Sequence, residues 1–185
     1  MTYTLSSKLS QGRRLLGPSL FTATARGTFS GNDISCRCAV GRSGILLADQ
    51  KREGDGASPL GSWPMRGVFY RPDRVERPET MLPCIALKQH DGWCDQPGHI
   101  LYNRPVSLPF SGHHEVLWRD DAIYDIIVEL GHNDSPVKHG FGSAVFLHVA
   151  RPDYAATEGC VALSAPDLRQ VLKQCDEQTE LKICF

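Results

Sequence analysis

The sequence predicts a mainly β protein, a sandwich or mixed sheet, with one clear helix in its C-terminal half. Short apolar runs are separated by glycine, proline and Asn-Asp turns, as in a series of strands. Residues 122–130 alternate with the two-residue period of a strand, and helical spacing becomes clear after residue 164. The 185 residues fit a single domain.

Composition excludes several classes of protein. Hydrophobic residues make up 41% and charged residues 22%, as is usual for a soluble globular protein. The formal net charge of -1 provides no field that would favour nucleic acid or an anionic membrane. No apolar run approaches the ~20 residues needed to span a bilayer. The N-terminal sequence also lacks a continuous apolar core after a basic start, so we expect no secretory signal.

In the first half we expect a peripheral segment over 1–19, followed by the domain itself over 20–185. Residues 20–48 contain short runs of strand-forming residues, broken at glycines and at Asn32-Asp33, as in a meander. Residues 51–64 are dominated by Gly, Ser, Asp and Pro, which predicts a loop. Residues 65–70 then predict a strand.

The middle of the chain is less regular. We expect an exposed connection over 74–79 and a short strand over 85–89. Residues 91–110 contain Pro97, Gly98, Pro105 and Pro109 and several aromatic residues, which predicts an irregular excursion. Because loops on a rigid scaffold often carry binding groups, this segment is either part of a cleft wall or a surface loop held in place by buried aromatics.

The C-terminal third gives the clearest pattern. A strand is predicted over 122–130, and residues 141–150 are apolar on both faces, as in a strand that is covered on each side. Ser164, Pro166 and Asp167 suit the cap and first turn of a helix. Leu168, Val171, Leu172 and Cys175 follow at helical spacing, so Cys175 is expected in the core. Residues 181–185 predict a closing edge strand.

One stretch combines a base with a nucleophile. A cysteine attacks a carbonyl as its thiolate, so a base must lie within hydrogen-bond reach. His148 precedes Cys160 by twelve positions, and the Pro152-Asp153 turn and Gly159 can fold the chain back between them. Gly159 also allows main-chain N–H groups to converge on an oxyanion. The alternative is a buried structural histidine.

The order His148, Thr157, Gly159, Cys160 resembles the signature of the YkuD-like L,D-transpeptidases, bacterial cysteine enzymes that cross-link peptidoglycan. The segments GDGASPLGSWPMRGVFYRPDR and TEGCVALSAPDL resemble further parts of that family. The similarity covers roughly residues 20–185. It implies a β-sandwich with a cleft over Cys160, a thioester acyl-enzyme, acylation by carbapenems and no cofactor.

The resemblance also assigns roles. Cys160 would be the nucleophile, His148 the base and Gly159 part of the oxyanion-binding turn. Contacts to the donor and acceptor stem peptides are expected from His132, Thr157, Glu158, Tyr102 and Arg104. Glu158 occupies a position where the family commonly has His or Lys. Ala162 occupies a position where the family commonly has Arg or Asn. The cross-link, 3–3 or 1–3, is therefore left open. The family implies a periplasmic or cell-envelope location and a part in cell shape.

Three alternatives accompany this hypothesis. Water as the acceptor would give an L,D-carboxypeptidase or endopeptidase at the same site, and an inert Cys160 would leave a peptidoglycan-binding module. A zinc hydrolase would use several of the seven histidines. His113 and His114 are adjacent and would point to opposite faces of a strand, so we expect no metal. Cys84 and Cys94 could form a disulfide in an oxidising compartment.

Overall fold

The computed structural model describes residues 20–185, so the expected peripheral segment over 1–19 lies outside the described residues. The described part is mainly β with one short α-helix, which confirms the predicted fold class. The elements follow in this order: β1 (Leu20–Thr24), β2 (Thr28–Gly31), β3 (Ile34–Arg37), β4 (Ile45–Leu47), β5 (Ser58–Tyr70), β6 (Cys84–Ala86), β7 (Asp91–Cys94), β8 (Arg104–Ser107), β9 (His114–Val116), the 3-10 helix η1 (Ala122–Tyr124), β10 (Ile126–Leu130), β11 (Phe146–Val149), β12 (Val161–Leu163), α1 (Ala165–Leu172) and β13 (Glu180–Cys184).

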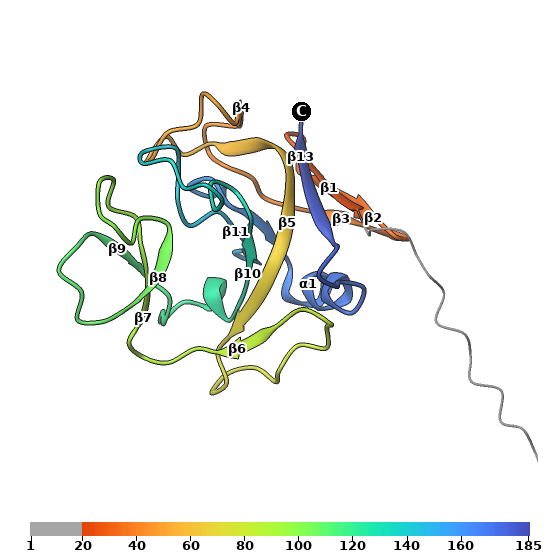
Figure 1. The fold of residues 1–185 in the computed structure, drawn as a ribbon. Helices are drawn as coiled ribbons and strands as arrows, with labels where there is room; N and C mark the ends of the chain where they lie inside the picture. The colour runs from red at the N-terminus through yellow and green to blue at the C-terminus, as the bar shows by residue number, and fades with distance from the viewer. Residues whose placement is uncertain (1–19) are drawn as a thin grey trace, which may run out of the picture.

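The strands form a large mixed sheet that nearly closes into a barrel. Its order is β12-β11-β10-β5-β13-β1-β2-β3, and β4 and β6 also pair with β5. The two ends meet because Ala39, just after β3, exchanges two main-chain hydrogen bonds of 2.9 Å with Ala162 in β12. A separate three-stranded sheet, β8-β7-β9, lies to one side (Figure 1).

Strand β5 is the longest strand of the sheet and runs through the centre of Figure 1. Its thirteen residues pair with β4, β6, β10 and β13. The prediction of loop over 51–64 is therefore wrong from Ser58 onward. Prolines and glycine give this segment the composition of a loop, but pairing with β4 and β13 overrides it, and the Trp63 indole N–H also donates to the Pro59 carbonyl at 3.0 Å.

Three other elements differ from the predictions. Residues 122–124 form η1, so β10 begins only at Ile126, and its residues 126–128 are buried on both faces. Strand β13 is an interior strand and not an edge, because it pairs with β5 on one side and with β1 on the other. The segment expected to be irregular, 91–110, contains β7 and β8. These pairings join segments far apart in the chain, which local pattern does not reveal.

Helix α1 begins as predicted. The Ser164 hydroxyl accepts a hydrogen bond from the Asp167 N–H at 3.2 Å, and Pro166 lies in the first turn. The helix ends at Leu172, and Cys175 lies just beyond it, 1% exposed, in the core as expected.

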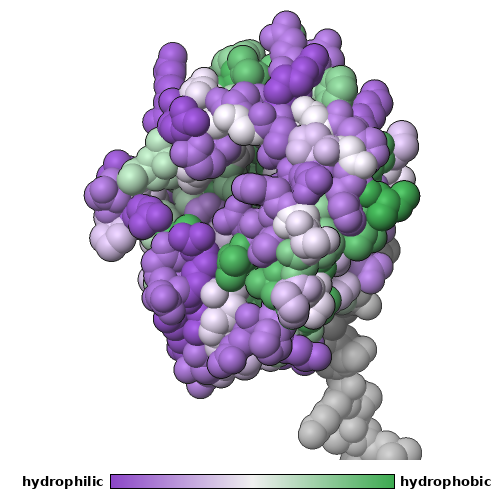
Figure 2. Space-filling model, turned by 90° about the vertical axis from the view of Figure 1, so that its left-hand side faces the viewer, coloured by the Kyte–Doolittle hydropathy of each residue, from purple (hydrophilic) through white to green (hydrophobic). Residues whose placement is uncertain are grey.

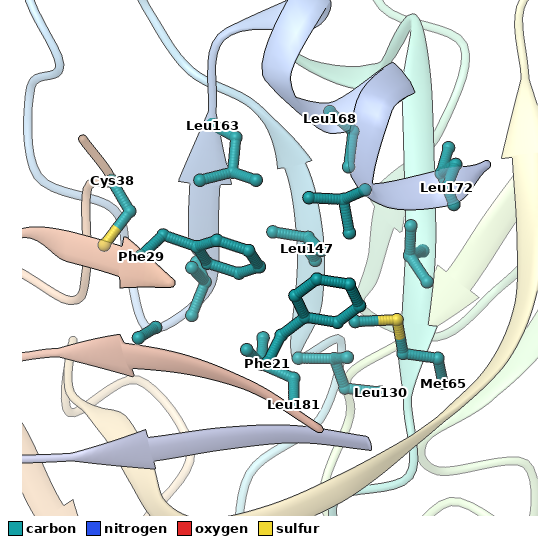
Figure 3. Packing of buried hydrophobic residues seen from close by; sticks show 14 of the residues in the cluster. Phe21, Phe29, Cys38, Met65, Leu130, Leu147, Leu163, Leu168, Leu172 and Leu181 are labelled. Atoms are coloured by element: carbon teal, nitrogen blue, oxygen red, sulfur yellow. The ribbon is translucent and has the colours of Figure 1, made fainter. Parts of the chain in front are cut away.

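The main core fills the space between the large sheet and α1. Phe21 and Phe29 stack with ring centroids 5.5 Å apart, and Leu168 and Leu172 of α1 pack with Leu147 in the same cluster (Figure 3). A second, smaller cluster lies on the other face of β10 and β11 and includes Phe146. Strand β11 is therefore covered on both sides, as predicted for residues 141–150.

The side of the molecule that bears the small sheet is mostly hydrophilic, with hydrophobic residues gathered in a few patches (Figure 2). Within residues 20–185, no helix is both long and apolar enough to cross a membrane.

We expect Leu147→Ala to lower the free energy of unfolding by about 2–5 kcal/mol, because Leu147 is fully buried in the main core and its loss leaves a cavity. Urea denaturation measures the change. Ile100→Ala is the control, since Ile100 is 89% exposed and its truncation should change stability by less than about 0.5 kcal/mol. Equal effects of the two substitutions would contradict this assignment of the core.

Candidate active site

Cys160 lies at the end of a tight turn that leads into β12. Gly159 has φ +135°, and a Cβ at this position would lie 2.8 Å from the Ala57 carbonyl oxygen, so another residue would both strain the backbone and clash. Thr157 closes the turn, because its hydroxyl donates to the Cys160 carbonyl at 2.6 Å and accepts from the Gly159 N–H at 3.2 Å. Thr157 therefore shapes the turn.

The first residue of β5 supports this turn from below. Ser58 is fully buried, and its hydroxyl donates to the Cys160 carbonyl at 3.2 Å while it accepts from the Gly41 N–H at 2.9 Å. The Cys160 carbonyl thus receives two hydroxyl hydrogen bonds, which fix the main chain on which the thiol is carried.

The register of two parallel strands brings His148 and Cys160 together. Strand β11 pairs with β12 so that Leu147 lies opposite Val161 and His148 opposite Ala162. Side chains alternate between faces, so Cys160, two residues before Ala162, points to the same face as His148. Both line one cavity of about 420 Å³.

The Cys160 thiol is buried and neutral. It is 9% exposed, its sulfur accepts from the Phe146 N–H at 3.3 Å, and it donates to the Ala144 carbonyl at 3.2 Å. Burial raises its pKa from an ordinary 9.0 to about 12, against the opposing effect of the Phe146 N–H. At neutral pH the group is a thiol.

His148 is held as a neutral base. Its Nδ1 lies 2.9 Å from the Val149 carbonyl, which can only accept, so Nδ1 carries the proton and Nε2 is free to act as a base. Burial lowers its pKa from 6.5 to about 4. The ring meets the edge of Tyr124 with centroids 5.4 Å apart, which fixes its plane.

Both hydrogen-bond partners of the thiol, Ala144 and Phe146, are main-chain groups, so the structure has no direct hydrogen bond between Cys160 and His148. The two groups rest as a neutral thiol and a neutral imidazole facing one cavity. Chemically, such an arrangement can carry out nucleophilic attack once the thiol proton is transferred to Nε2.

A buried ion pair lies against the same turn and is not evident from the sequence. The Lys51 ammonium, 4% exposed, donates to the Asp55 carboxylate at 2.6 Å and to the Arg52 carbonyl at 2.9 Å. A Cβ on Gly159 would lie only 3.9 Å from Lys51 Cε. The Lys51 charge opposes the effect of burial by lowering the pKa of Cys160, though less strongly than burial raises it.

The lining of the cavity also contains residues that the sequence did not predict. Glu115 in β9, Arg119 and Tyr124 line it together with Arg151, which follows β11. The Tyr124 hydroxyl donates to Glu115 at 3.2 Å, and Arg119 makes a two-pronged ion pair with Asp121. The only local signal was the density of charges in the segment 113–121.

The expected substrate contacts divide into two groups. Thr157 and Glu158 line the cavity, and Glu158 is held at its rim by Arg42 Nε at 2.7 Å. His132, Tyr102 and Arg104 are not among the lining residues.

Each of those three side chains has a partner inside the protein. His132 Nε2 donates to the Phe141 carbonyl at 3.0 Å, and its ring meets Trp63 edge-on. Tyr102, 1% exposed, donates to Glu53, and Arg104 donates to the Asp134 carbonyl at 2.7 Å. In this structure they support loops rather than face the cavity.

All seven cysteines lie in the described part and are free thiols, so Cys84 and Cys94 do not form a disulfide. Within residues 20–185, no three His, Cys, Asp or Glu side chains are grouped so that they could hold a metal ion.

Comparison with known proteins identifies the family. The model of the YkuD L,D-transpeptidase catalytic domain matches residues 23–183, and the chain therefore belongs to this family. The family resemblance deduced from His148, Thr157, Gly159 and Cys160 is thus confirmed. Members of this family are normally cysteine enzymes of the bacterial cell wall.

None of the curated proteins matches the sequence. Among solved structures, L,D-transpeptidase 1 of Mycobacterium tuberculosis is similar, with 14% sequence identity and a TM-score of 0.42. The match covers 91% of this chain and 62% of that one.

The buried imidazole predicts a loss of stability in acid. The pKa of His148 is about 4 when folded against 6.5 ordinarily, so the unfolded chain binds a proton more readily. The stabilisation is complete above about pH 6.5 and is lost as the pH falls through 4, which removes about 3 kcal/mol from the free energy of unfolding. Urea denaturation as a function of pH measures it.

His148→Gln should make that pH dependence shallower, whereas His90→Gln, at an exposed position, should leave it unchanged. If the His148 variant lost stability in acid as steeply as the unsubstituted protein, the neutral state assigned to His148 would be wrong.

Proposed function

We propose that this chain is a peptidoglycan L,D-transpeptidase of the cell envelope, which joins stem peptides through an acyl-enzyme on Cys160. The observation that carries the proposal is the placement of Cys160 and His148 on one face of adjacent parallel strands, lining one cavity. Membership of the L,D-transpeptidase family supplies the substrate class.

In the first half-reaction the thiol attacks an amide carbonyl of the donor stem peptide. Cys160 turns from the Ala144 carbonyl toward His148, and Nε2 takes its proton as sulfur bonds to the carbonyl carbon. Because the pKa of the thiol is about 12 and that of the imidazole about 4, a resting ion pair is unfavourable. Proton transfer therefore accompanies attack, and the imidazolium then protonates the leaving amine.

Main-chain N–H groups stabilise the oxyanion that forms in this step. The Gly159 N–H already donates to the Thr157 hydroxyl, so the N–H of Cys160, assisted by that of Glu158, is the donor we assign. Loss of one such donor costs on the order of 3 kcal/mol in the barrier. Thr157 and Ser58 contribute by fixing the Cys160 carbonyl, and with it the direction of the adjacent N–H groups.

In the second half-reaction an amine of another stem peptide attacks the thioester, which gives the cross-link and restores the thiol. An acceptor amine on diaminopimelate gives either a 3–3 or a 1–3 link, according to the donor. Water as the acceptor would make the same site an L,D-carboxypeptidase or endopeptidase.

We expect a carbapenem to add its mass to the protein, because the strained lactam acylates the Cys160 thiol. Intact-protein mass spectrometry measures the adduct. Cys160→Ala should give none, and His148→Gln should slow adduct formation by about 100-fold to 10,000-fold, which is the usual contribution of a general base.

Cys94→Ala is the matched control, since Cys94 is also a fully buried thiol but does not line the cavity, and it should leave the adduct unchanged. An adduct that persists in the Cys160 variant would reject this nucleophile, and complete absence of an adduct would favour a non-catalytic peptidoglycan-binding module. Muropeptide analysis of cells with and without the protein then identifies the bond that is made.

A further inference from the structure

The second half-reaction requires more proton transfer than His148 alone provides, if the proposed function holds. An aliphatic acceptor amine has a pKa of about 10.4 and arrives as an ammonium ion, which must lose two protons to become an amide. His148 has one free nitrogen and a pKa of about 4, so it is a weak base toward an ammonium ion. A second proton acceptor on the cavity wall would remove this difficulty.

Glu115 lies where such a group is needed. It comes from β9 of the small sheet and lines the same cavity as Cys160 and His148. Its Oε1 accepts from the Tyr124 hydroxyl at 3.2 Å, and Tyr124 in turn meets the ring of His148 at 5.4 Å and that of Phe146 at 6.1 Å. The negative charge of Glu115 also raises the pKa of Cys160, second among the raising effects to burial. The carboxylate is therefore near the reacting pair.

Glu115 also has capacity for a ligand. Its hydrogen bond to Tyr124 is long and its ion pair with Arg119, at 3.6 Å, is longer still; both are made by Oε1, and no hydrogen bond to Oε2 is present. Among the described residues, His132 Nδ1 is the only fully buried side-chain nitrogen or oxygen that lacks a partner. The unpartnered Oε2 of Glu115 is consequently open to solvent, and its side chain is 32% exposed.

The other acids of the cavity are more strongly engaged. Glu53 accepts from both Tyr102 and Ser143, Asp95 is bonded to His113, and Glu158 is paired with Arg42. None of them contacts Tyr124. Glu115 is thus the acid best placed to meet an incoming cation beside Cys160.

The groups around Glu115 shift its pKa. Burial raises its pKa, the Tyr124 hydroxyl and Arg119 lower it, Asp95 raises it and His113 lowers it, and the net result is an upward shift. A carboxylate with a raised pKa is a stronger base than an ordinary one, which suits it to proton transfer.

We infer that Glu115 is a catalytic residue that binds the acceptor ammonium and removes its first proton. The carboxylate takes that proton, and the free amine attacks the thioester carbon. As the tetrahedral intermediate collapses, the C–S bond breaks and the second proton of the nitrogen passes through His148 Nε2 to the sulfur. An amide and the Cys160 thiol result, and Glu115 releases its proton to water.

The test separates the two half-reactions. A purified disaccharide-tetrapeptide serves as donor and, through its own amine, as acceptor, and dimer formation is followed by liquid chromatography. In parallel, hydroxylamine replaces the acceptor, because it is already neutral at pH 7 and needs no first deprotonation. Carbapenem adduct formation reports acylation alone.

Glu115→Gln should lower the rate of dimer formation by about 100-fold, the usual scale of a general base. Its carbapenem acylation and its hydroxamate formation should stay within about threefold of the unsubstituted protein. Glu129→Gln is the matched control, since Glu129 is also a partly buried glutamate with a pKa raised by burial but lies away from the cavity. It should change none of the three rates.

Two results would overturn the inference. Unchanged dimer formation would show that Glu115 is not needed, and a parallel fall in all three rates would show that it only supports the fold. Failure of the unsubstituted protein to form either adduct or dimer would instead reject the proposed function itself.

Discussion

The parallel pairing of β11 with β12 is the constraint on which the whole site depends. A slip of one residue would turn Cys160 to the main core and leave His148 without a partner, because side chains alternate between faces. The register is held from both sides of β12, by β11 and by the two hydrogen bonds between Ala162 and Ala39 that nearly close the barrel. Ser58 then fixes the turn that precedes the strand. The hydrogen bonds that nearly close the sheet therefore also fix the position of the thiol.

Burial has opposite effects on the two groups that face the cavity. It raises the pKa of the Cys160 thiol to about 12 and lowers that of the His148 imidazole to about 4, because it disfavours the charged form of each. The thiol therefore rests in its unreactive protonated form, and in the proposed reaction it loses its proton to His148 only as sulfur bonds to the carbonyl carbon. Since oxidation also proceeds through the thiolate, the same burial protects the sulfur from oxidation.

The sequence alone predicts those features whose signal is local. Residue type and spacing predicted the turn at Gly159 and the cap at Ser164, whereas the role expected of His148 came from the resemblance to the family signature. Lys51 and Glu115 line the cavity, and Ser58 supports the turn before Cys160, only through tertiary contacts that local pattern does not reveal. The same reason explains why β5 and β13 were predicted wrongly. The loop-like composition of β5 is overridden by pairing with the strands on either side, and β13 is interior only because β1 and β5 pair with it.

The small side chain of Ala162 bears on how a substrate carboxylate could be held. Ala162 lies opposite His148 and is 1% exposed, so a long cationic side chain at this position would enter the cavity directly beside the imidazole. The arginines that line the cavity come from elsewhere, and Arg119 is already held by both carboxylate oxygens of Asp121. Arg151 makes only one long contact with Asp121, at 3.5 Å, and its side chain is 51% exposed. Of these two guanidinium groups, Arg151 therefore has more donors left for an anionic group in the cavity.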